Sequence, residues 1–417
     1  MIISRNSLST PDIPRRGREA QERRIYLPYD PSDAANLRHW MEQHADEMLD
    51  LLIRLVEAES PTPDVASQAG PQSILREAFA GLGYDVRTLV GSDPRDGGQL
   101  LARPPREGRP ATYQLVVGHS DTVWDRGTLR SMPIEIRNRM MYGPGAFDMK
   151  ASLVQIVFAL RALRTLELEP EVAPVAYVNS DEEIGSPYSE RHTALLARRA
   201  DRALIVEPAS GPDGRIKTGR KGNGTYQVTV RGKAAHAGLD PEEGRNAIVA
   251  AADLVRRLHE LNDYARGMTV VVGQIEGGTR SNVVPAECRF SVDFRASTWA
   301  DLEALTRAIE GLAPELPDTS VEFDGGIERA PLERTPRNRR LWEVVRQAGA
   351  ALDLELEEVF VGGGSDGNIT TVHAPTVDGL GPVGAGAHAR HEHVMLDSLP
   401  ERAALLSLVL LAPPLGA

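Results

Sequence analysis

Gln114-Leu-Val-Val-Gly118 is a short apolar run that ends at His119, and this pattern predicts a buried strand. Two further apolar runs have the same form: residues 172–178 precede three carboxylates, and residues 203–206 precede Glu207. A helical pattern lies between the first two runs. Strands that alternate with helices predict an α/β fold, a mainly parallel sheet flanked by helices. Because sites of open α/β sheets form at the C-terminal ends of strands, we expect the polar residues to gather there.

The pattern changes from about residue 217, where the order strand, helix, strand, strand, helix, strand predicts a compact α+β, ferredoxin-like unit. We interpret this unit as a domain inserted into the first one. Upstream, residues 33–57 are predicted to form one helix. The predicted division is a tail, a first part of the main domain, the insertion and a second part of the main domain, at residues 1–30, 31–216, 217–327 and 328–417.

The bulk composition excludes several classes of protein and site. Hydrophobic residues make up 41% of the 417 residues, which is normal for a globular protein, and the net charge is −12. This acidity argues against nucleic-acid and anionic-membrane binding. The single cysteine, Cys288, excludes an internal disulfide and a cysteine-based zinc site, so any metal must be held by His, Asp and Glu. The Arg-rich start lacks the apolar region of a secretory signal, so we expect a cytoplasmic protein.

Three motifs combine residue types that suit metal-dependent hydrolysis. His119 and Asp121 stand two apart on an extended segment, so the Asp can accept the ring N–H of a metal-bound His. Asp148 follows a Gly-Pro-Gly turn and precedes a helical pattern, where an anion is favoured. In Asp181-Glu-Glu183 one carboxylate can bind metal while its neighbour takes a proton from water. Taken singly, a surface His–Asp pair and a plain helix N-cap explain the first two motifs better than a metal site does, and an acidic turn explains the third equally well.

Four further features have plain structural explanations when each is taken alone. Glu207 ends an apolar strand, and His236 lies in a Lys-Ala-Ala-His-Ala-Gly segment of the insertion. The loop Gly362-Gly-Gly-Ser365 is rich in backbone donors that could cradle a carboxylate. Three histidines crowd one stretch, and spacing alone leaves open which of them acts as a ligand: His388, His391 and His393.

In their order along the chain, these motifs resemble those of the M20 metallopeptidase family, and within it the glutamate carboxypeptidase branch and aminoacylase-type hydrolases. The resemblance covers about residues 40–412. His-x-Asp-x-Val, Gly-x-Gly-x-x-Asp-Met-Lys, Asp-Glu-Glu-x-Gly-Ser and Glu-Pro all occur in the family's order. The resemblance implies a zinc-peptidase-like catalytic domain and an inserted dimerisation domain, and therefore a homodimer.

The resemblance also implies two divalent metal ions per subunit, zinc by default with manganese or cobalt as alternatives. Glu182 would be the general base that activates water and later the acid, and Asp121 would orient a ligating histidine. His388 is chosen as a ligand because the family pattern His-x-x-Asn/Asp-Glu-Tyr-Val fits residues 388–394, although histidines replace the Asn/Asp and the Tyr. Asp148 would bridge the two ions, and the full ligand set would be His119, Asp148, Glu183, Glu207 and His388.

Substrate contacts follow from the same resemblance. His236 matches a histidine that reaches the partner subunit's active site and stabilises the oxyanion. Arg215 falls where the glutamate branch carries a lysine. Several basic residues in an acidic protein indicate a small anionic substrate, and the implied substrate contacts are Arg215, Asn282, Arg295, Arg329, Gly363 and Ser365.

The expected activity is hydrolysis of a C–N bond next to a carboxylate, with carboxypeptidase-like release of an amino acid such as glutamate. A deacylase of N-acyl amino acids, or a hydrolase of an unusual small amine or amide, remains open because it would share every motif. A non-catalytic binding protein on the same fold is a third hypothesis. Such a protein would be expected to lose Glu182 or a metal ligand, and the chain retains them all.

Overall fold

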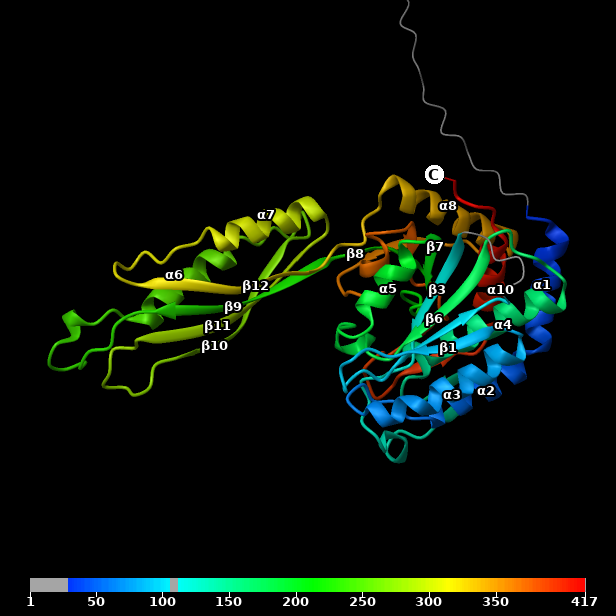
Figure 1. Cartoon of the computed structure of the whole chain (residues 1–417), viewed down its shortest axis with the longest axis horizontal. Coiled ribbons are helices and arrows are strands. Elements are labelled where there is room, and N and C mark those ends of the chain that lie inside the picture. Colours follow the sequence, from blue (N-terminus) through cyan, green and yellow to red (C-terminus); the bar gives the residue numbers. More distant parts are fainter. Residues whose placement is uncertain (1–28, 106–111, 417) are drawn as a thin grey trace, which may run out of the picture.

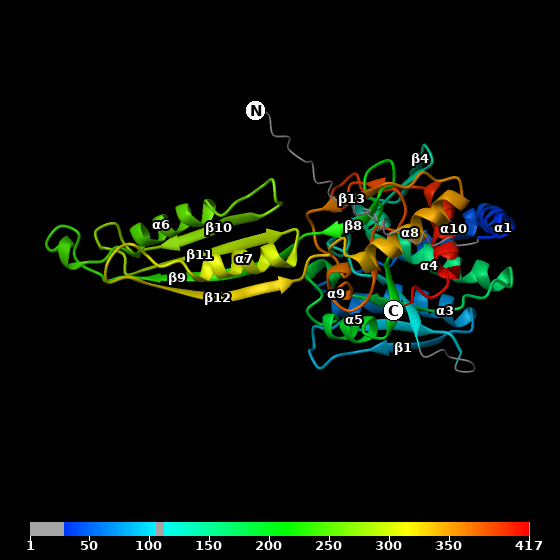
Figure 2. The same ribbon diagram turned by 90° about the horizontal axis from the view of Figure 1, so that it is seen from above.

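A computed structural model describes residues 29–105 and 112–416. The chain forms two lobes (Figures 1 and 2). The small lobe comprises residues 222–329 and extends as a narrow arm from the large lobe. The large lobe is formed by the described residues before and after this segment. The predicted tail lies almost entirely outside the described residues. In the part of the chain that the structure describes, no helix is long and apolar enough to cross a membrane.

The large lobe is built on a six-stranded sheet. Its central strands β6, β3, β7 and β14 are parallel, and β2 and β1 add an antiparallel edge. This arrangement confirms the predicted mainly parallel sheet. In sheet order the strands are β1 (Asp85–Leu89), β2 (Gln99–Arg103), β6 (Ala173–Asn179), β3 (Tyr113–His119), β7 (Ala200–Ile205) and β14 (Thr376–Val377).

Helices cover both faces of this sheet because its strands are apolar on both sides. On one face, Leu196 and Ala197 of α5 (Glu190–Ala197) pack against buried strand residues. On the other face, α4 is buried on nearly all sides because it lies between the sheet and α10. The helices of that main core are α1 (Pro31–Gln43), α2 (Ala45–Glu57), α3 (Ala69–Gly81), α4 (Ala151–Thr165), α8 (Pro336–Ala351) and α10 (Ser398–Leu411).

The prediction of one helix over residues 33–57 is wrong, because α1 and α2 are separate and meet at His44. The His44 ring stacks on Trp40 with the ring centroids 3.8 Å apart. Its Nδ1 lies 2.7 Å from the Trp40 carbonyl oxygen. The His44 ring thus contacts a carbonyl oxygen that would otherwise accept a hydrogen bond within the helix. The backbone of His44 leaves helical geometry, with φ −106° and ψ 13°.

The small lobe has a four-stranded antiparallel sheet in the order β10-β11-β9-β12. Strand β9 alternates buried and exposed residues, and Tyr226, Val228 and Val230 face the helices. Cys288 is buried in the same core, as its strand pattern suggests. The division at residues 217 and 327 stays a prediction. The elements are β9 (Gly222–Arg231), α6 (Ala247–His259), β10 (Thr269–Gly277), β11 (Glu287–Ala296), α7 (Trp299–Glu310) and β12 (Ser320–Arg329).

Two small sheets connect distant segments of the large lobe. Strand β8 (Ile216–Arg220), which leads into the small lobe, pairs in parallel with β13 (Glu358–Val361). A second sheet joins the segment before Asp148 to the segment after His388. Its strands, in order, are β15 (Gly384–Ala385), β16 (His393–Met395), β5 (Met140–Tyr142) and β4 (Glu135–Arg137).

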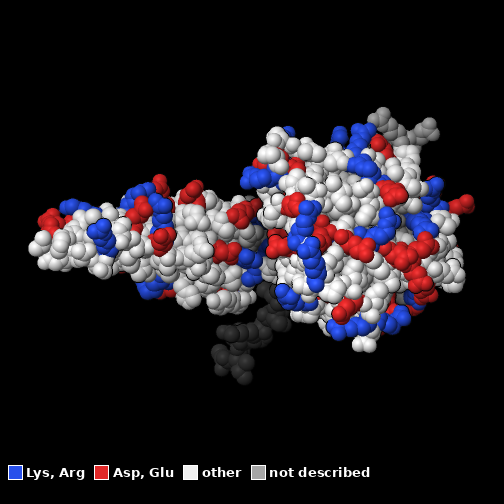
Figure 3. Space-filling view, turned by 90° about the horizontal axis from the view of Figure 1, so that it is seen from below, with Lys and Arg blue, Asp and Glu red and all other residues white. Residues whose placement is uncertain are grey.

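The surface charges are mixed in sign on the face shown in Figure 3. Basic and acidic side chains are interspersed there over both lobes, without a broad basic region. This face therefore offers no electrostatic platform for a nucleic-acid backbone.

Candidate metal centre and active site

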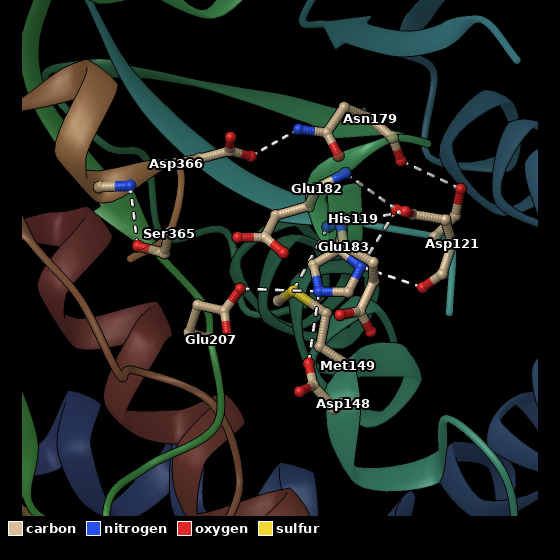
Figure 4. Close-up of polar contacts among 12 residues, drawn as sticks. His119, Asp121, Asp148, Met149, Asn179, Glu182, Glu183, Glu207, Ser365 and Asp366 are labelled. Atoms are coloured by element: carbon tan, nitrogen blue, oxygen red, sulfur yellow. Dashed lines mark hydrogen bonds and ion pairs between the residues drawn. The ribbon is translucent and has the colours of Figure 1, made fainter. Parts of the chain in front are cut away.

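The candidate ligands gather where three neighbouring strands end. Strand β3 ends at His119, β6 leads into the Asp181–Glu183 turn, and β7 leads to Glu207. Because β6, β3 and β7 are parallel neighbours, their carboxyl ends meet at one edge of the sheet (Figure 4). This is the edge at which the sequence places the site.

Two groups of potential ligands adjoin each other. His119 Nε2 lies 3.3 Å from Asp148 Oδ1 and 3.6 Å from Glu207 Oε1. His388 Nε2 lies 3.5 Å from Asp148 Oδ2 and 3.0 Å from Glu183 Oε2. Within each group the ligand atoms lie within 4.8 Å of one another. Asp148 belongs to both groups, one oxygen to each, so the structure brings together all five predicted ligands.

Asp148 comes from a distorted turn rather than from the start of a regular helix. The helix expected from residue 149 begins at Ala151, and Asp148 itself has φ −112° and ψ 98°. Gly145 precedes it with φ 70°, a conformation that suits glycine. The turn thus projects the carboxylate toward His119, whose backbone N–H contacts Met149 Sδ at 3.3 Å (Figure 4).

The residues present fit two divalent cations. Asp148 Oδ1 and Glu183 Oε1 are buried and form no hydrogen bond of regular geometry with the described residues, with His119 Nε2 3.3 Å from the first of them. Buried carboxylate oxygens are costly unless a cation or donor compensates them. Imidazole nitrogens and carboxylate oxygens are the ligands that zinc and related divalent metals accept. The donor set and the two uncompensated oxygens therefore match a dinuclear site.

The same crowding of charge shifts the pKa values of the site. Burial, together with the charge of Glu207, raises the pKa of Glu182 well above its ordinary range. Burial and the charge of Asp148 raise the pKa of Glu207 to about 7. Hydrogen bonds with Asp148 and Glu183 raise the pKa of His388 to about 10. The protein alone therefore holds an excess of negative charge that bound cations would neutralise.

Asp121 contacts both a ligand and the acidic turn. Its Oδ1 lies 3.3 Å from His119 Nδ1, and its own carbonyl oxygen lies 3.0 Å from the same nitrogen. Its Oδ2 accepts hydrogen bonds from Thr62 Oγ1 at 2.8 Å and from the Glu183 N–H at 3.2 Å. The Glu182 N–H lies 3.4 Å from Oδ1. One buried side chain thus orients the His119 ring and the turn that carries Glu182 and Glu183.

Two predicted substrate contacts lie where the small lobe joins the large one. Arg329, at the end of β12, donates from Nη2 to Ser186 Oγ at 3.2 Å, close enough for its charge to act on Glu182. Arg295, at the end of β11, forms an ion pair with Asp293 at 2.9 Å. Its Nη1 lies 3.5 Å from the carbonyl oxygen of Gly362 in the glycine-rich loop.

Three other predicted contacts occupy distinct places. Ser365 is fully buried and donates to Asp378 Oδ2 at 2.5 Å. Gly363 is exposed in the glycine-rich loop. Arg215 lies in the turn that precedes β8, and its buried Nε has no hydrogen-bond partner among residues 29–105 and 112–416. The substrate roles of these residues stay predictions.

His236 and Asn282 lie away from the metal ligands of their own chain. His236 lies between β9 and α6 and Asn282 between β10 and β11, in loops that a bridge between His236 and Val283 brings together beyond the end of β9. The His236 Nδ1 accepts hydrogen bonds from the N–H groups of Gly238 and Leu239 at 3.1 and 3.2 Å. In the neutral ring the proton must then sit on Nε2, which is free to act as a donor.

Lys217 and Arg220 on β8 also lie beside the ligands, and sequence reasoning missed both. The charges of Glu207 and Asp148 act on Lys217, while burial lowers its pKa. Its Nζ makes no hydrogen bond to the described residues. Arg220 donates to Asp378 Oδ2 at 2.7 Å, and its buried Nη2 has no partner in the described part of the chain.

A β-bulge in β8 explains why the alternation of the sequence did not place Lys217 and Arg220 on one face. Residues three apart on a regular strand point to opposite faces. In β8, Lys217 pairs with Val359 and Gly219 with Phe360, so Thr218 is an extra residue. The bulge shifts the alternation by one and turns Lys217 and Arg220 toward the same side.

Residues 218–319 match the peptidase dimerisation domain of the M20 family. The chain is 29% identical to carboxypeptidase G2 of Pseudomonas sp. (strain RS-16) over 359 residues, which covers 84% of this chain and 85% of that protein. It is 28% identical to a succinyl-diaminopimelate desuccinylase of Dechloromonas aromatica (strain RCB) over 384 residues, with coverage of 88% and 98%.

Solved structures share the fold. The aminopeptidase PepT of Bacillus cereus superposes with a TM-score of 0.73 at 22% identity, covering 88% of this chain and 98% of that one. An M20 family metallo-carboxypeptidase of Sulfolobus solfataricus gives a TM-score of 0.66 at 18% identity, covering 88% and 99%. A dinuclear metal-binding M20 peptidase of Bacillus subtilis gives 0.66 at 13% identity, covering 89% and 98%.

Proposed function

We propose that the chain, which is similar to M20 metallopeptidases and amide hydrolases over most of its length, hydrolyses the C–N bond next to a carboxylate in a small anionic substrate. The observation that carries this proposal is the pair of adjoining ligand groups that share Asp148, with Glu182 beside them. When bound, two divalent ions would act as Lewis acids on the scissile carbonyl and lower the pKa of water.

We propose that one ion is held by His119, Asp148 and Glu207 and the other by Asp148, Glu183 and His388. Zinc is the default for this set of imidazole and carboxylate ligands, and manganese and cobalt suit it as well. Asp121 supports the assignment because it contacts Nδ1 of the His119 ring and leaves Nε2 to face the other ligands.

Glu182 has the properties of the general base. It stands next to the ligand Glu183, but it belongs to neither ligand group. Figure 4 shows its carboxylate beside Glu207 and His119, inside the site. From this position the carboxylate can take a proton from water and deliver it to the leaving nitrogen.

The basic side chains around the ligands support an anionic substrate. Lys217, Arg220 and Arg329 all act electrostatically on carboxylates of the site. A carboxylate of the substrate would give the free Nζ of Lys217 a partner. We propose carboxypeptidase-like release of an amino acid such as glutamate as the first candidate reaction. Removal of a carboxylated acyl group from an amine is the second candidate, and desuccinylases among the relatives favour it.

A substrate panel separates these two candidates. The metal-free protein would be loaded with zinc or, separately, with manganese. It would then be offered N-acyl amino acids, dipeptides, folate-like glutamates and N-succinyl amines, with products identified by mass spectrometry. Preferred release of glutamate or aspartate would establish the carboxypeptidase reaction. Preferred release of succinate would establish the deacylase, and hydrolysis of neutral substrates alone would contradict the anionic substrate.

Lys217→Met is expected to raise KM for the preferred anionic substrate about 10- to 100-fold, because a hydrogen bond to a charged group contributes roughly 1.5–3 kcal/mol. The value of kcat should change much less. Steady-state kinetics of the wild type and of Lys217→Met would measure both constants. Lys233→Met is the matched control, since Lys233 is exposed on the small lobe. An unchanged KM in Lys217→Met would remove Lys217 from the substrate site.

We propose that two copies of the chain pair through the small lobe. Strand β10 is an edge strand that exposes Val271 and Ile275, with 54% and 56% of their surface accessible. An unpaired edge with exposed apolar residues favours association. His236 and Asn282, distant from the ligands of their own chain, could then serve the site of the partner.

Replacing both Val271 and Ile275 by lysine is expected to convert the dimer to a monomer and to lower activity strongly. Sedimentation velocity would report the oligomeric state of each variant. Val90→Lys is the matched control, because Val90 is 62% exposed on the large lobe. A fully active wild-type monomer would contradict the pairing and the proposed role of His236 together.

A further inference from the structure

Glu392 is a fully buried carboxylate that the proposed reaction does not use. Its Oε2 accepts hydrogen bonds from the Trp124 indole N–H at 2.7 Å and the Gly145 N–H at 3.0 Å. Its Oε1 accepts from the N–H groups of Phe147 and Asp148, both at 3.0 Å. Three of the four donors therefore belong to the turn that carries the shared ligand.

The number of donors matches the ionised form of the side chain. A carboxylate is an acceptor with about four lone-pair sites, and four N–H groups face it here. The buried ammonium group of Lys150 lies near enough for the two charges to interact. A glutamine in this place would direct its NH₂ group at two N–H donors. It has the same shape as glutamate but cannot reproduce the contacts.

Glu392 also joins two ligand segments that are distant in sequence. It lies four residues after His388, and its N–H donates to the Ala389 carbonyl oxygen at 2.8 Å. The following strand β16 pairs with β5, which leads into the turn of Asp148. The loop of His388 and the turn of Asp148 are therefore attached through both the sheet and this carboxylate.

The shared ligand needs such support from its backbone. Asp148 Oδ1 is buried beside His119 Nε2, at 3.3 Å, without a hydrogen bond of regular geometry to the described residues, and the backbone angles of Asp148 are not helical. The direction of its carboxylate therefore depends on where the backbone of the turn is held.

We propose that Glu392 is a positioning residue of the metal centre, holding the turn of Asp148 so that the two oxygens of that ligand face His119 and His388. The proposal rests on the ligand assignment proposed above. It predicts that the carboxylate of Glu392 contributes to metal affinity without touching a metal ion or the substrate.

The test measures metal binding, which does not depend on knowing the substrate. Metal-free wild type, Glu392→Gln and Glu392→Asp would each be titrated with zinc by calorimetry. Absorption spectra of their cobalt forms would report the ligand geometry. Trp124→Phe removes one donor and leaves the three backbone donors in place. Glu401→Gln is the matched control, because Glu401 is a partly exposed residue of α10 outside the site.

We expect Glu392→Gln to bind both ions about 10- to 100-fold more weakly and to change the cobalt spectrum, as loss of a residue that supports metal ligands typically does. Trp124→Phe should weaken binding less, and Glu401→Gln should match wild type. If Glu392→Gln does not fold, Glu392→Asp and Trp124→Phe take its place, with a measurable loss expected in both.

Two outcomes would overturn different statements. A folded Glu392→Gln with wild-type affinity and cobalt spectrum would show that Glu392 only stabilises the fold. Wild-type affinity in both Glu392→Asp and Trp124→Phe would show the same. Failure of the wild-type protein to bind two ions would instead overturn the ligand assignment itself.

Discussion

Glu182→Gln is expected to lower kcat by about 10²- to 10⁴-fold, the usual contribution of a general acid–base group, while both metal ions stay bound. The amide has nearly the shape of the carboxylate, but it cannot take the proton from water or return it to the leaving nitrogen. Glu182 belongs to neither ligand group, so the affinity for metal should change little.

Single-turnover kinetics with metal analysis of the same samples would measure both quantities. Glu190→Gln is the matched control, because Glu190 is exposed in the first turn of α5 and lies outside the ligand groups. Turnover that survives in Glu182→Gln with two ions present would show that another group accepts the proton.

Asp148→Asn is expected to abolish stable binding of both ions, and activity with them. Asp148 is the one residue common to both ligand groups, and each of its oxygens faces a different histidine. An amide offers one neutral oxygen in place of two charged ones. Because ions that bind only the folded state stabilise it, the loaded variant should also lose the metal-dependent rise in Tm.

Metal content after dialysis and the thermal shift on adding zinc would measure the effect of Asp148→Asn. Glu183→Gln provides the internal comparison, since Glu183 belongs to one ligand group only and this variant should keep one ion. Asp397→Asn is the control for loss of an exposed aspartate. Retention of two ions by Asp148→Asn would exclude a shared ligand at this position.

The sheet was predictable because its signal is local. Strands β6, β3 and β7 each contain a short apolar run, and the polar residues stand at or just beyond the end of the strand, as with His119 at the end of β3 and Glu207 two residues after β7. Selecting His388 needed the whole motif, since three histidines share that stretch. The structure places His388 within reach of Asp148 and Glu183, whereas the ring of His393 lies against Tyr142, with centroids 4.9 Å apart.

The features that escaped prediction depend on geometry that periodicity does not express. Lys217 and Arg220 face the same way only because Thr218 is an extra residue in β8. Glu392 accepts hydrogen bonds from backbone N–H groups of residues 145–148. Because every residue type except proline has such a group, these contacts leave no pattern in the sequence. The break between α1 and α2 arises from one side-chain contact of His44 with Trp40.

The order of the ligands along the chain also constrains how the protein matures during synthesis. Four of the five precede the small lobe, whereas His388 follows it near the C-terminus. The small lobe has its own hydrophobic core, and its central strand β9 pairs with β11 and β12, so its sheet is complete only when β12 has been synthesised. The second group is complete only once His388 has been synthesised, and Glu392, which contacts the turn of Asp148, follows four residues later.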